Sequence, residues 1–402
     1  MMGVLNHLST LLLLSLLPPA LSHVVEKFSD VPQCNKFFLN GSTPNLPGIL
    51  VGGEVQDQNH YKLICQKYNT IYRFATLYNT TNRIPVFSAY TFTGNTSQQK
   101  KTEKKIIIKK KNAGPPTDPT GDTTCTGSNQ NKSTSTNRPT WMIEPQLEDI
   151  NIKEMNTQHK MKKVLNKDID IEEMNFQREV KKMLNNRKVI VNQAVNTDYD
   201  KSGLDRGHLF PCSYAPDDDT KRSTCTLTNA VPQNENLNRV RWCTMECKVR
   251  EYLEKNCKDN NNKIEAYVVT GAVPNNNNNQ LNHRVNIPDL LWTAFCCETS
   301  EKDKWMAVAH WGENKEGLKN TKVLEPHNLA ELYDKLNKRY GNGVQLFPDQ
   351  CPKVDPPRAL PLKVGGDEHD HCVYDDDCVC SSVGVKGYYL PVVFVSVLVM
   401  MM

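Results

Sequence analysis

The chain has 402 residues, of which 38% are hydrophobic and 23% are charged, and its formal net charge is +4. This length suits one large domain or two ordinary ones, and the composition is that of a polar globular protein. The charge is too small to argue for a nucleic-acid partner by itself, because weak basicity is common in proteins that bind no polyanion.

The N-terminus carries the features of a secretory signal. Leu11 to Leu17 reads LLLLSLL, and Ala20-Leu21-Ser22 forms a small-x-small cleavage signature before His23. The apolar run is far shorter than the ~20 residues of a spanning helix. We therefore expect residues 1–22 to be a signal peptide and the mature protein to be secreted or to lie on the extracellular face of the membrane. Candidate glycan sites in Asn-x-Ser/Thr sequons follow at Asn40, Asn79, Asn95 and Asn131.

Ile71 to Tyr90 predicts a β-hairpin, because two β-rich runs flank the polar Asn79-Thr80-Thr81-Asn82. Residues 98–139 are rich in Lys and then in Gly, Pro, Thr, Ser and Asn, a composition that cannot bury a core and predicts a disordered insert. Its lysines are better explained as a solvated loop than as a phosphate site. Residues 153–187 are charged, with scattered Met, Leu and Ile, and predict surface helices.

The pattern sharpens from Val189 onward. Val189 to Val195 is β-prone, and Leu204 to Phe210 contains Asp-Arg-Gly-His, with His208 expected at the edge of a strand. Leu237 to Leu253 contains no Pro or Gly and predicts a helix. Further strands are expected at 267–271, 291–297 and 305–311, a polar loop at 274–279, and a terminal helix at 329–340 closed by Gly341. Mixed elements without βαβ periodicity favour an α+β fold.

Fourteen cysteines are spread along the chain. An even number scattered in this way predicts a disulfide framework formed in an oxidising compartment. Zinc binding is the alternative, but Cys243 and Cys247 lie four apart on a predicted helix, without His partners at zinc-ligand spacing nearby. The sequence does not give the pairing, although a bridge between Cys212 and Cys225 would brace the strands around the Asp-Arg-Gly-His stretch.

Residues 351–387 form a Cys-containing polar tail, and the hydrophobic residues 388–402 carry no charge. Fifteen residues are few for a spanning helix, and the small residues Ser381-Ser382 precede them, as in a lipid-anchor signal. A glycolipid anchor, a short membrane anchor and no attachment all stay open. Membrane attachment through this tail is therefore an expected interaction.

Residues 204–250 contain the groups that phosphodiester hydrolysis needs, which are a base for water, a metal ligand and positive charge for the transition state. On the expected helix, Asn238, Trp242, Glu246 and Arg250 follow one another in steps of four. Such steps keep neighbours on one face, with a drift of about 40° per step. Since Mg²⁺ often uses only one or two protein ligands, one amide oxygen can serve.

Each of these residues also has an ordinary explanation. A lone His is more often a surface or core residue than a base, and an Asn at a helix start is usually an N-cap. Glu246 and Arg250 are most simply an ion pair, and Trp242 is most simply part of the core. Only the assembly raises the catalytic interpretation above these explanations.

The combined motifs resemble the DNA/RNA non-specific endonuclease family, whose ββα-metal site carries an Asp-Arg-Gly-His signature. That signature is residues 205–208 here, followed by T-N-x2-P-Q at 228–233 and L-N-x3-W-x3-E at 237–246. Segments similar to the family's framework are 88–90, 269–271, 287–288 and Trp292. The resemblance covers roughly residues 72–311, and the W-M-I-E-P-Q segment 141–146 is most similar to a subgroup of endonuclease domain-containing proteins.

The resemblance implies a ββα-metal (His-Me finger) endonuclease fold within residues 23–350. That fold is α+β, with a central, mostly antiparallel sheet flanked by helices, and disulfides would brace it here. The implied reaction is cleavage of DNA and RNA with little sequence specificity, leaving 5′-phosphate and 3′-hydroxyl ends. The implied cofactor is Mg²⁺, for which Mn²⁺ can substitute.

The resemblance also implies residue roles. The family's upstream arginine, which stabilises the transition state, has Arg138 as its nearest candidate, although the spacing differs and an insert adjoins it. The other roles are general base for His208, metal ligand for Asn238, orientation of water around the metal for Glu246, support of the phosphate or the carboxylate for Arg206 and Arg250, and help in holding the site for Asn229.

Two functions stay open from the sequence. One is an active endonuclease, and the other is a secreted or anchored binding protein that kept the nuclease fold and lost turnover. The presence of both His208 and Asn238 favours the enzyme, because a relative without turnover would be expected to lose one of them.

Overall fold

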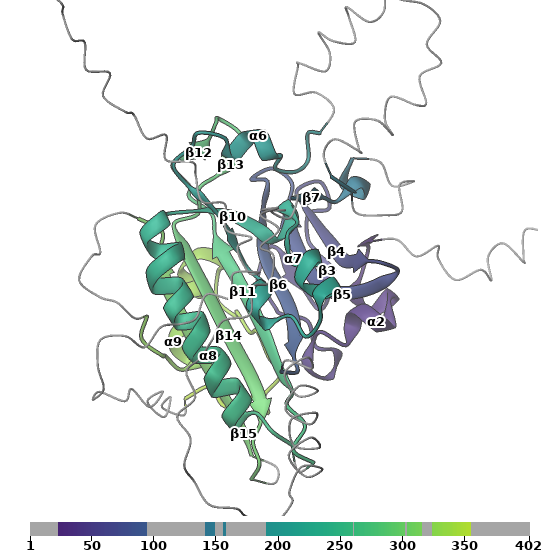
Figure 1. Ribbon diagram of the computed structural model, residues 1–402, viewed down its shortest axis with the longest axis vertical. Helices are drawn as coiled ribbons and strands as arrows, with labels where there is room; N and C mark the ends of the chain where they lie inside the picture. Colours follow the sequence, from purple (N-terminus) through teal and green to yellow (C-terminus); the bar gives the residue numbers. More distant parts are fainter. Residues whose placement is uncertain are drawn as a thin grey trace, which may run out of the picture.

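The computed structural model describes residues 23–94, 141–148, 156–157, 190–259, 261–301, 304–315 and 324–354. Its centre is a seven-stranded antiparallel sheet in the order β1-β4-β5-β6-β11-β14-β15 (Figure 1). These strands are β1 (Val24–Val25), β4 (Tyr61–Tyr68), β5 (Ile71–Asn79), β6 (Ile84–Phe92), β11 (Ala266–Val273), β14 (Leu290–Glu298) and β15 (Trp305–Glu313). Together with the helices on its two faces, this sheet confirms the predicted α+β class.

Four two-stranded pairs and several helices surround the sheet. The pairs are β2 (Leu50–Val51) with β3 (Glu54–Val55), β7 (Met142–Ile143) with β8 (Asn156–Thr157), β9 (Asp205–His208) with β10 (Ala230–Gln233), and β12 (Gln280–Leu281) with β13 (Val285–Asn286). The α-helices are α2 (Pro32–Asn35), α6 (Asn196–Tyr199), α7 (Asp218–Thr224), α8 (Cys243–Asn256) and α9 (Leu329–Tyr340). Short 3₁₀ turns lie at Phe28–Asp30, Leu39–Gly41, Pro145–Leu147, Cys212–Tyr214 and Leu227–Asn229.

The sheet is buried on both faces. Successive side chains of a strand point to opposite faces, so on β14 Leu291 and Phe295 pack in the cluster that includes α8, whereas Trp292 packs in the cluster that includes α9. Figure 1 shows the two helices on opposite sides of the sheet. On the neighbouring β11, Gly271 is required because a Cβ there would lie 2.3 Å from the ring of Trp292. Continuous burial explains why these strands read as nearly continuous apolar runs, interrupted by Thr270 and Thr293.

Disulfides connect the layers. The adjacent Cys296 and Cys297 project to opposite faces of β14, and they bond to Cys351 and to Cys257 at the end of α8. Cys34–Cys65 is a third bridge, and the disulfide-braced prediction is confirmed. A bridge between Cys212 and Cys225 does not form, because Cys225 is disulfide-bonded while Cys212 carries a thiol.

Local predictions with strong turn or cap signals are confirmed. The hairpin is β5 and β6, and Asn79 Oδ1 accepts a hydrogen bond from the backbone N–H of Asn82. Helix α9 begins with a capping box between Asn328 and Glu331 and ends at Gly341, where φ is 93°. Among the sequons, Asn40 is exposed, whereas Asn79 is 6% exposed and its oxygen is already bonded.

Two expectations are wrong in the described residues. Residues 190–195 form no strand, because side chains rather than a neighbouring strand take up their backbone N–H groups: Glu148 accepts from Val191 and Asn192, and the Tyr78 hydroxyl accepts from Ala194. Asn156–Thr157 form strand β8, where a surface helix was expected. In both places, contacts distant in sequence override local preference.

Several predicted segments lie outside the described residues. They are the signal peptide at 1–22, the insert at 98–139, most of the polar tail at 351–387 and the hydrophobic tail at 388–402. Within the part of the chain that the structure describes, no helix has the length and apolar character needed to cross a membrane.

Removing the bridge between α8 and β14 tests this framework. The double variant Cys257→Ala, Cys297→Ala is expected to lose about 4 kcal/mol of unfolding free energy, because chain entropy scales with the closed loop, here a sequence separation of 40. Urea unfolding measures it, with Cys247→Ser as the control, because this half-buried thiol lies on the same helix outside the bridges. Unchanged stability would show that the bridge contributes nothing.

Candidate active site

The Asp-Arg-Gly-His stretch forms one strand of a small two-stranded ribbon. In the sequence this ribbon lies between β6 and β11, which pair directly with each other in the central sheet. Strand β9 pairs antiparallel with β10, so that His208 lies opposite Ala230 and Asp205 lies opposite Gln233. Gly207 is required in this ribbon, because a Cβ there would lie 1.8 Å from Oε1 of Gln233 and 2.8 Å from its Cβ. The helix that follows β10 completes a ββα unit, the arrangement that the resemblance implied.

That helix begins earlier than expected and starts with a π-helical segment. Helical residues begin at Glu235, and Asn234 Oδ1 accepts the backbone N–H of Asn236, as an N-cap does. Asn238 therefore lies inside the helix, and the N-cap explanation for it is wrong. Leu237–Trp242 is π-helical, with the N–H of Cys243 bonded to the carbonyl of Asn238 five residues earlier.

The buried carboxylate of Asp205 joins the ribbon to this helix. Asp205 is 3% exposed and accepts hydrogen bonds from Asn238 Nδ2 at 3.0 Å and from Arg239 Nε at 2.9 Å. Arg239 Nη2 also donates to Asp205 Oδ1 at 2.6 Å, so the contact between the guanidinium and the carboxylate is bidentate. Because a carboxylate only accepts, the NH₂ of Asn238 must face Asp205 and its Oδ1 must face away. Sequence reasoning assigned no role to Asp205 or Arg239, although Asp205 opens the signature.

His208 presents a buried ring nitrogen to the site. Its Nε2 has no hydrogen-bond partner among the residues that the structure describes. The ring of Trp141 packs against the imidazole, with centroids 4.9 Å apart. Burial lowers the pKa of His208 from 6.5 to about 4, so the imidazole is neutral at pH 7 and able to accept a proton.

Arg206 lies on the same face of β9 as His208, two residues away, as strand alternation requires. Its guanidinium lies 4.8 Å from the ring centroid of Tyr199 and 5.8 Å from that of Trp141. Nη2 donates to the carbonyl of Asn196 at 3.0 Å. Burial lowers the pKa of Arg206, but an arginine stays charged in this range. A fixed positive charge therefore lies beside the candidate base.

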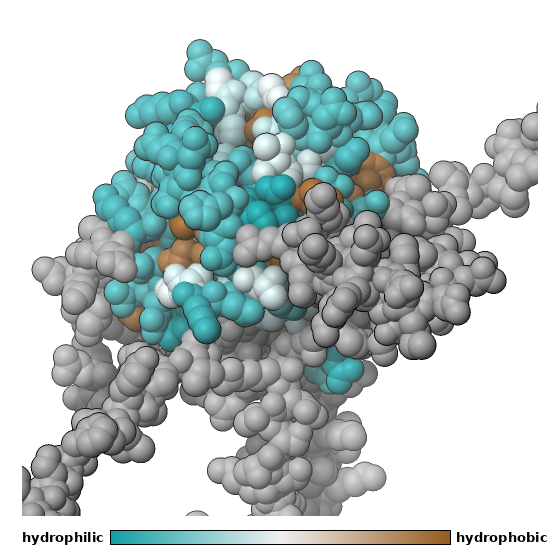
Figure 2. All heavy atoms as spheres, turned by 90° about the horizontal axis from the view of Figure 1, so that it is seen from above, coloured by the Kyte–Doolittle hydropathy of each residue, from teal (hydrophilic) through white to brown (hydrophobic). Residues whose placement is uncertain are grey.

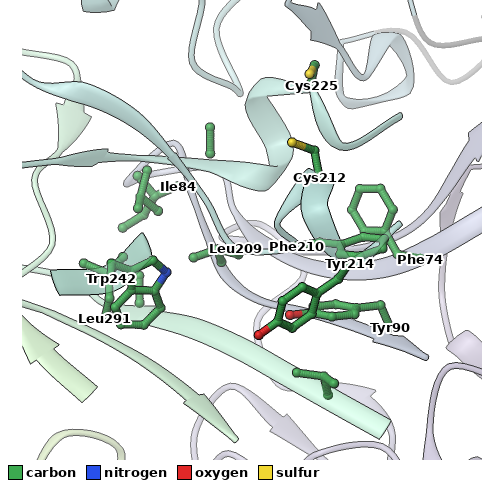
Figure 3. Close-up of a cluster of buried hydrophobic side chains, with 14 of the residues drawn as sticks. Phe74, Ile84, Tyr90, Leu209, Phe210, Cys212, Tyr214, Cys225, Trp242 and Leu291 are labelled. Carbon is green, nitrogen blue, oxygen red and sulfur yellow. The ribbon is translucent and has the colours of Figure 1, made fainter. Parts of the chain in front are cut away.

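The chain after His208 is anchored to the central sheet by Asn229. Its Nδ2 donates to the carbonyls of Phe210 and Thr224, and its Oδ1 accepts from the Phe210 N–H and the Ser88 hydroxyl. Phe210 also stacks on Tyr90 of β6 at 4.0 Å (Figure 3). Asn229 is fully buried with its polar atoms bonded within the protein, so its geometry is that of a positioning residue.

Glu246 and Arg250 lie one and two turns beyond Trp242. Glu246 Oε1 accepts a hydrogen bond from the buried Trp242 Nε1 at 2.8 Å, and its carbonyl accepts from the Tyr214 hydroxyl at 2.7 Å. The Nε of Arg250 is buried without a hydrogen-bond partner within the described ranges. Trp242 thus lies in the core (Figure 3) and also orients Glu246. Arg138 lies outside the described residues.

The donor set fits a hard cation held by few protein atoms. In the described part of the chain, no group of three or more His, Cys, Asp or Glu side chains could hold a metal. Asn238 Oδ1, directed away from Asp205, is an oxygen ligand of the kind Mg²⁺ takes, and Mg²⁺ keeps several waters in such sites. The residues present therefore fit a single-ligand Mg²⁺ site and do not fit a zinc site.

The surrounding surface is polar. The end of the molecule that carries α6, β12 and β13 is mostly hydrophilic where it is coloured, with small separate hydrophobic spots (Figure 2). Such a surface suits a charged, hydrated ligand better than an apolar one.

Residues 185–350 match the model of a family described as DNA/RNA non-specific endonuclease. Over these residues the chain is similar to the DNA/RNA non-specific endonuclease family. The match covers the ribbon, the π-helical segment and α8, so the family resemblance predicted from the motifs is confirmed.

Curated relatives agree with this assignment. The endonuclease domain-containing 1 protein of Homo sapiens is 27% identical over 274 residues, which are 68% of this chain and 40% of that protein. The Mus musculus protein of the same name is 26% identical over 324 residues, 80% of this chain and 48% of that protein. The chain thus spans less than half the length of either. A solved chain from the EndoG/EndoGI complex is 16% identical with a TM-score of 0.40, covering 72% of this chain and 91% of that one.

The titration of His208 tests the site without reference to activity. In ¹³C-histidine-labelled protein with chelator present, its resonance, assigned with His208→Gln, is expected to titrate near pH 4. Because the folded pKa lies below the ordinary 6.5, His208 should also reduce stability progressively as pH falls from about 6.5 toward 4. A midpoint near 6.5 would show that Nε2 is solvated.

Proposed function

We propose that this protein is a Mg²⁺-dependent endonuclease that hydrolyses phosphodiester bonds of DNA and RNA with little sequence specificity. The observation that carries the proposal is a neutral, half-buried His208 with a buried Nε2, beside Arg206 on a ribbon whose Asp205 orients Asn238. The proposal includes secretion or display on the extracellular face of the membrane, which the N-terminal signal and the C-terminal tail support.

The residues divide the reaction among them. His208 Nε2 accepts a proton from water as the water oxygen bonds to phosphorus and the P–O3′ bond breaks. The leaving 3′-oxygen takes a proton from solvent water, so the products carry 5′-phosphate and 3′-hydroxyl ends. Arg206 supplies positive charge where the pentacoordinate state gathers negative charge. Asn238 Oδ1 would hold the Mg²⁺, which when bound supplies Lewis-acid stabilisation of the phosphate oxygens. Glu246, oriented by Trp242, would arrange nearby water.

Loss of the base is the first test. His208→Ala is expected to lower kcat for plasmid nicking and RNA cleavage about 10²- to 10⁴-fold, because general bases contribute that much. The matched control His283→Ala removes an exposed imidazole and should keep full activity. Circular dichroism checks that both variants fold.

Three outcomes distinguish an active endonuclease from a binding protein that kept the nuclease fold. Activity that requires Mg²⁺, disappears with chelator and depends on His208 supports the enzyme. Full activity in His208→Ala removes this residue from the mechanism. Absence of cleavage in the folded wild-type protein, with retained binding of DNA or RNA, would favour a binding protein that kept the nuclease fold.

Metal titration tests Asn238. Asn238→Ala is expected to raise the Mg²⁺ concentration for half-maximal cleavage on the order of tenfold or more, because the site offers few other protein oxygens. Asn236→Ala is the matched control, since it removes an exposed amide one residue before the π-helical segment. An unchanged Mg²⁺ titration in Asn238→Ala would argue against ligation.

A further inference from the structure

The residue that follows the predicted signal cleavage site lies in the interior. His23 has no exposed surface, and its backbone nitrogen donates to Gln146 Oε1 at 2.6 Å. The same oxygen accepts from the backbone N–H of Val24 at 2.9 Å. The carbonyl of His23 accepts from the N–H of Cys65 at 2.6 Å, so this residue extends the edge strand β1 along β4. A chain start held this firmly by buried side chains is unusual.

A buried carboxylate faces the same point. Glu144 Oε2 lies 3.0 Å from His23 Nδ1, and the two side chains are 0% and 1% exposed. Glu144 itself is fixed, because its backbone N–H and carbonyl are both bonded to the side-chain amide of Gln193. A buried acid is costly unless a positive group balances it. Within the described residues, its ion-pair contact is with the His23 imidazole.

We propose that His23 is the mature N-terminal residue and that its α-ammonium group binds in the polar pocket formed by Glu144 and Gln146. Cleavage before His23 converts a neutral amide N–H into a positively charged group with three donors, at the atom that Gln146 already holds. Processing thereby places a positive charge on the residue whose side chain contacts the buried Glu144. The proposal rests on the predicted cleavage site and does not depend on nuclease activity.

This pocket is connected to the candidate active site through the chain. Glu144 and Gln146 belong to the segment 141–148, whose first residue, Trp141, packs against the His208 imidazole. Binding of the new N-terminus would therefore fix the segment that covers the base. In this last step, which rests on the proposed function, removal of the signal peptide completes the site after translocation.

A residue retained before His23 should not be accommodated in the same way. The His23 nitrogen would then stay an amide that donates one hydrogen bond to Gln146 Oε1, in place of an ammonium group with three donors. An amide nitrogen also carries no charge to balance Glu144. Blocking the N-terminus is therefore the sharpest test.

The experiment uses the processed full-length chain. Mass spectrometry of the secreted protein identifies its first residue. An amine-reactive label at about pH 7, where α-amines (pKa ~8) react in preference to lysines (pKa ~10.4), then measures access to the α-amine. The variants are one Gly added before His23 and Glu144→Gln, with Glu54→Gln, an exposed acid in an ion pair, as the matched control. Thermal unfolding is recorded for each.

We expect His23 as the first residue, with labelling on the order of tenfold or more slower in the folded than in the unfolded protein. The added Gly should lower Tm, and Glu144→Gln should lower Tm and accelerate labelling, while Glu54→Gln behaves as wild type. A different first residue, an α-amine labelled as fast as in the unfolded chain, or an unchanged Tm on adding Gly would overturn the proposal. None of these measurements depends on nuclease activity, so a catalytically silent protein would leave them valid.

Discussion

The site depends on the contact of one buried carboxylate with one helix. Asp205 comes from a strand, whereas Asn238 and Arg239 come from the helix that follows the second strand. Arg239 balances the charge that burial would otherwise penalise, because breaking such a pair leaves an uncompensated ion. With its charge balanced by Arg239, Asp205 also accepts a hydrogen bond from Asn238 Nδ2 and so orients the Asn238 amide. The carboxylate of Asp205 thus fixes the direction of Asn238 Oδ1 and is not itself the proposed metal ligand.

The π-helical segment explains how Asn238 and Glu246 come to share a face. In a regular α-helix two steps of four residues drift by about 80°. A π-helix has ~4.4 residues per turn, so the step from Asn238 to Trp242 drifts about 30° the other way, and the next α-helical step nearly cancels it. The sequence showed the spacing but gave no signal for the π geometry, and Leu237 and Trp242 at its two ends both pack in the core.

The sequence predicted the elements whose structure follows from local turn, cap and pattern signals. It did not predict the features that depend on contacts between distant segments. The β5–β6 hairpin and α9 carry their own turn and cap residues, and the strands on either side of Gly271 carry nearly continuous apolar runs. By contrast, residues 190–195 are β-prone yet irregular, because Glu148 and Tyr78 take up their N–H groups. The motif residues His208 and Asn238 were found by resemblance. The positions of Asp205 and Trp141 around them required the fold.

The low pKa of His208 constrains how such a site can work. A base with a pKa of about 4 is always available at pH 7 but is intrinsically weak, since proton transfer follows Brønsted behaviour. In the proposed mechanism, positive charge in the site must therefore make the water proton more acidic. Arg206 provides one fixed charge, held over two aromatic rings where it cannot rotate freely, and a divalent cation at Asn238 would provide the other. The burial that weakens the base also lowers the local dielectric constant. A lower dielectric constant strengthens the electrostatic interactions of both charges. Burial favours the neutral imidazole, so in the proposed mechanism the weakness of the base follows from the same burial that would strengthen the interactions of these charges with the phosphate.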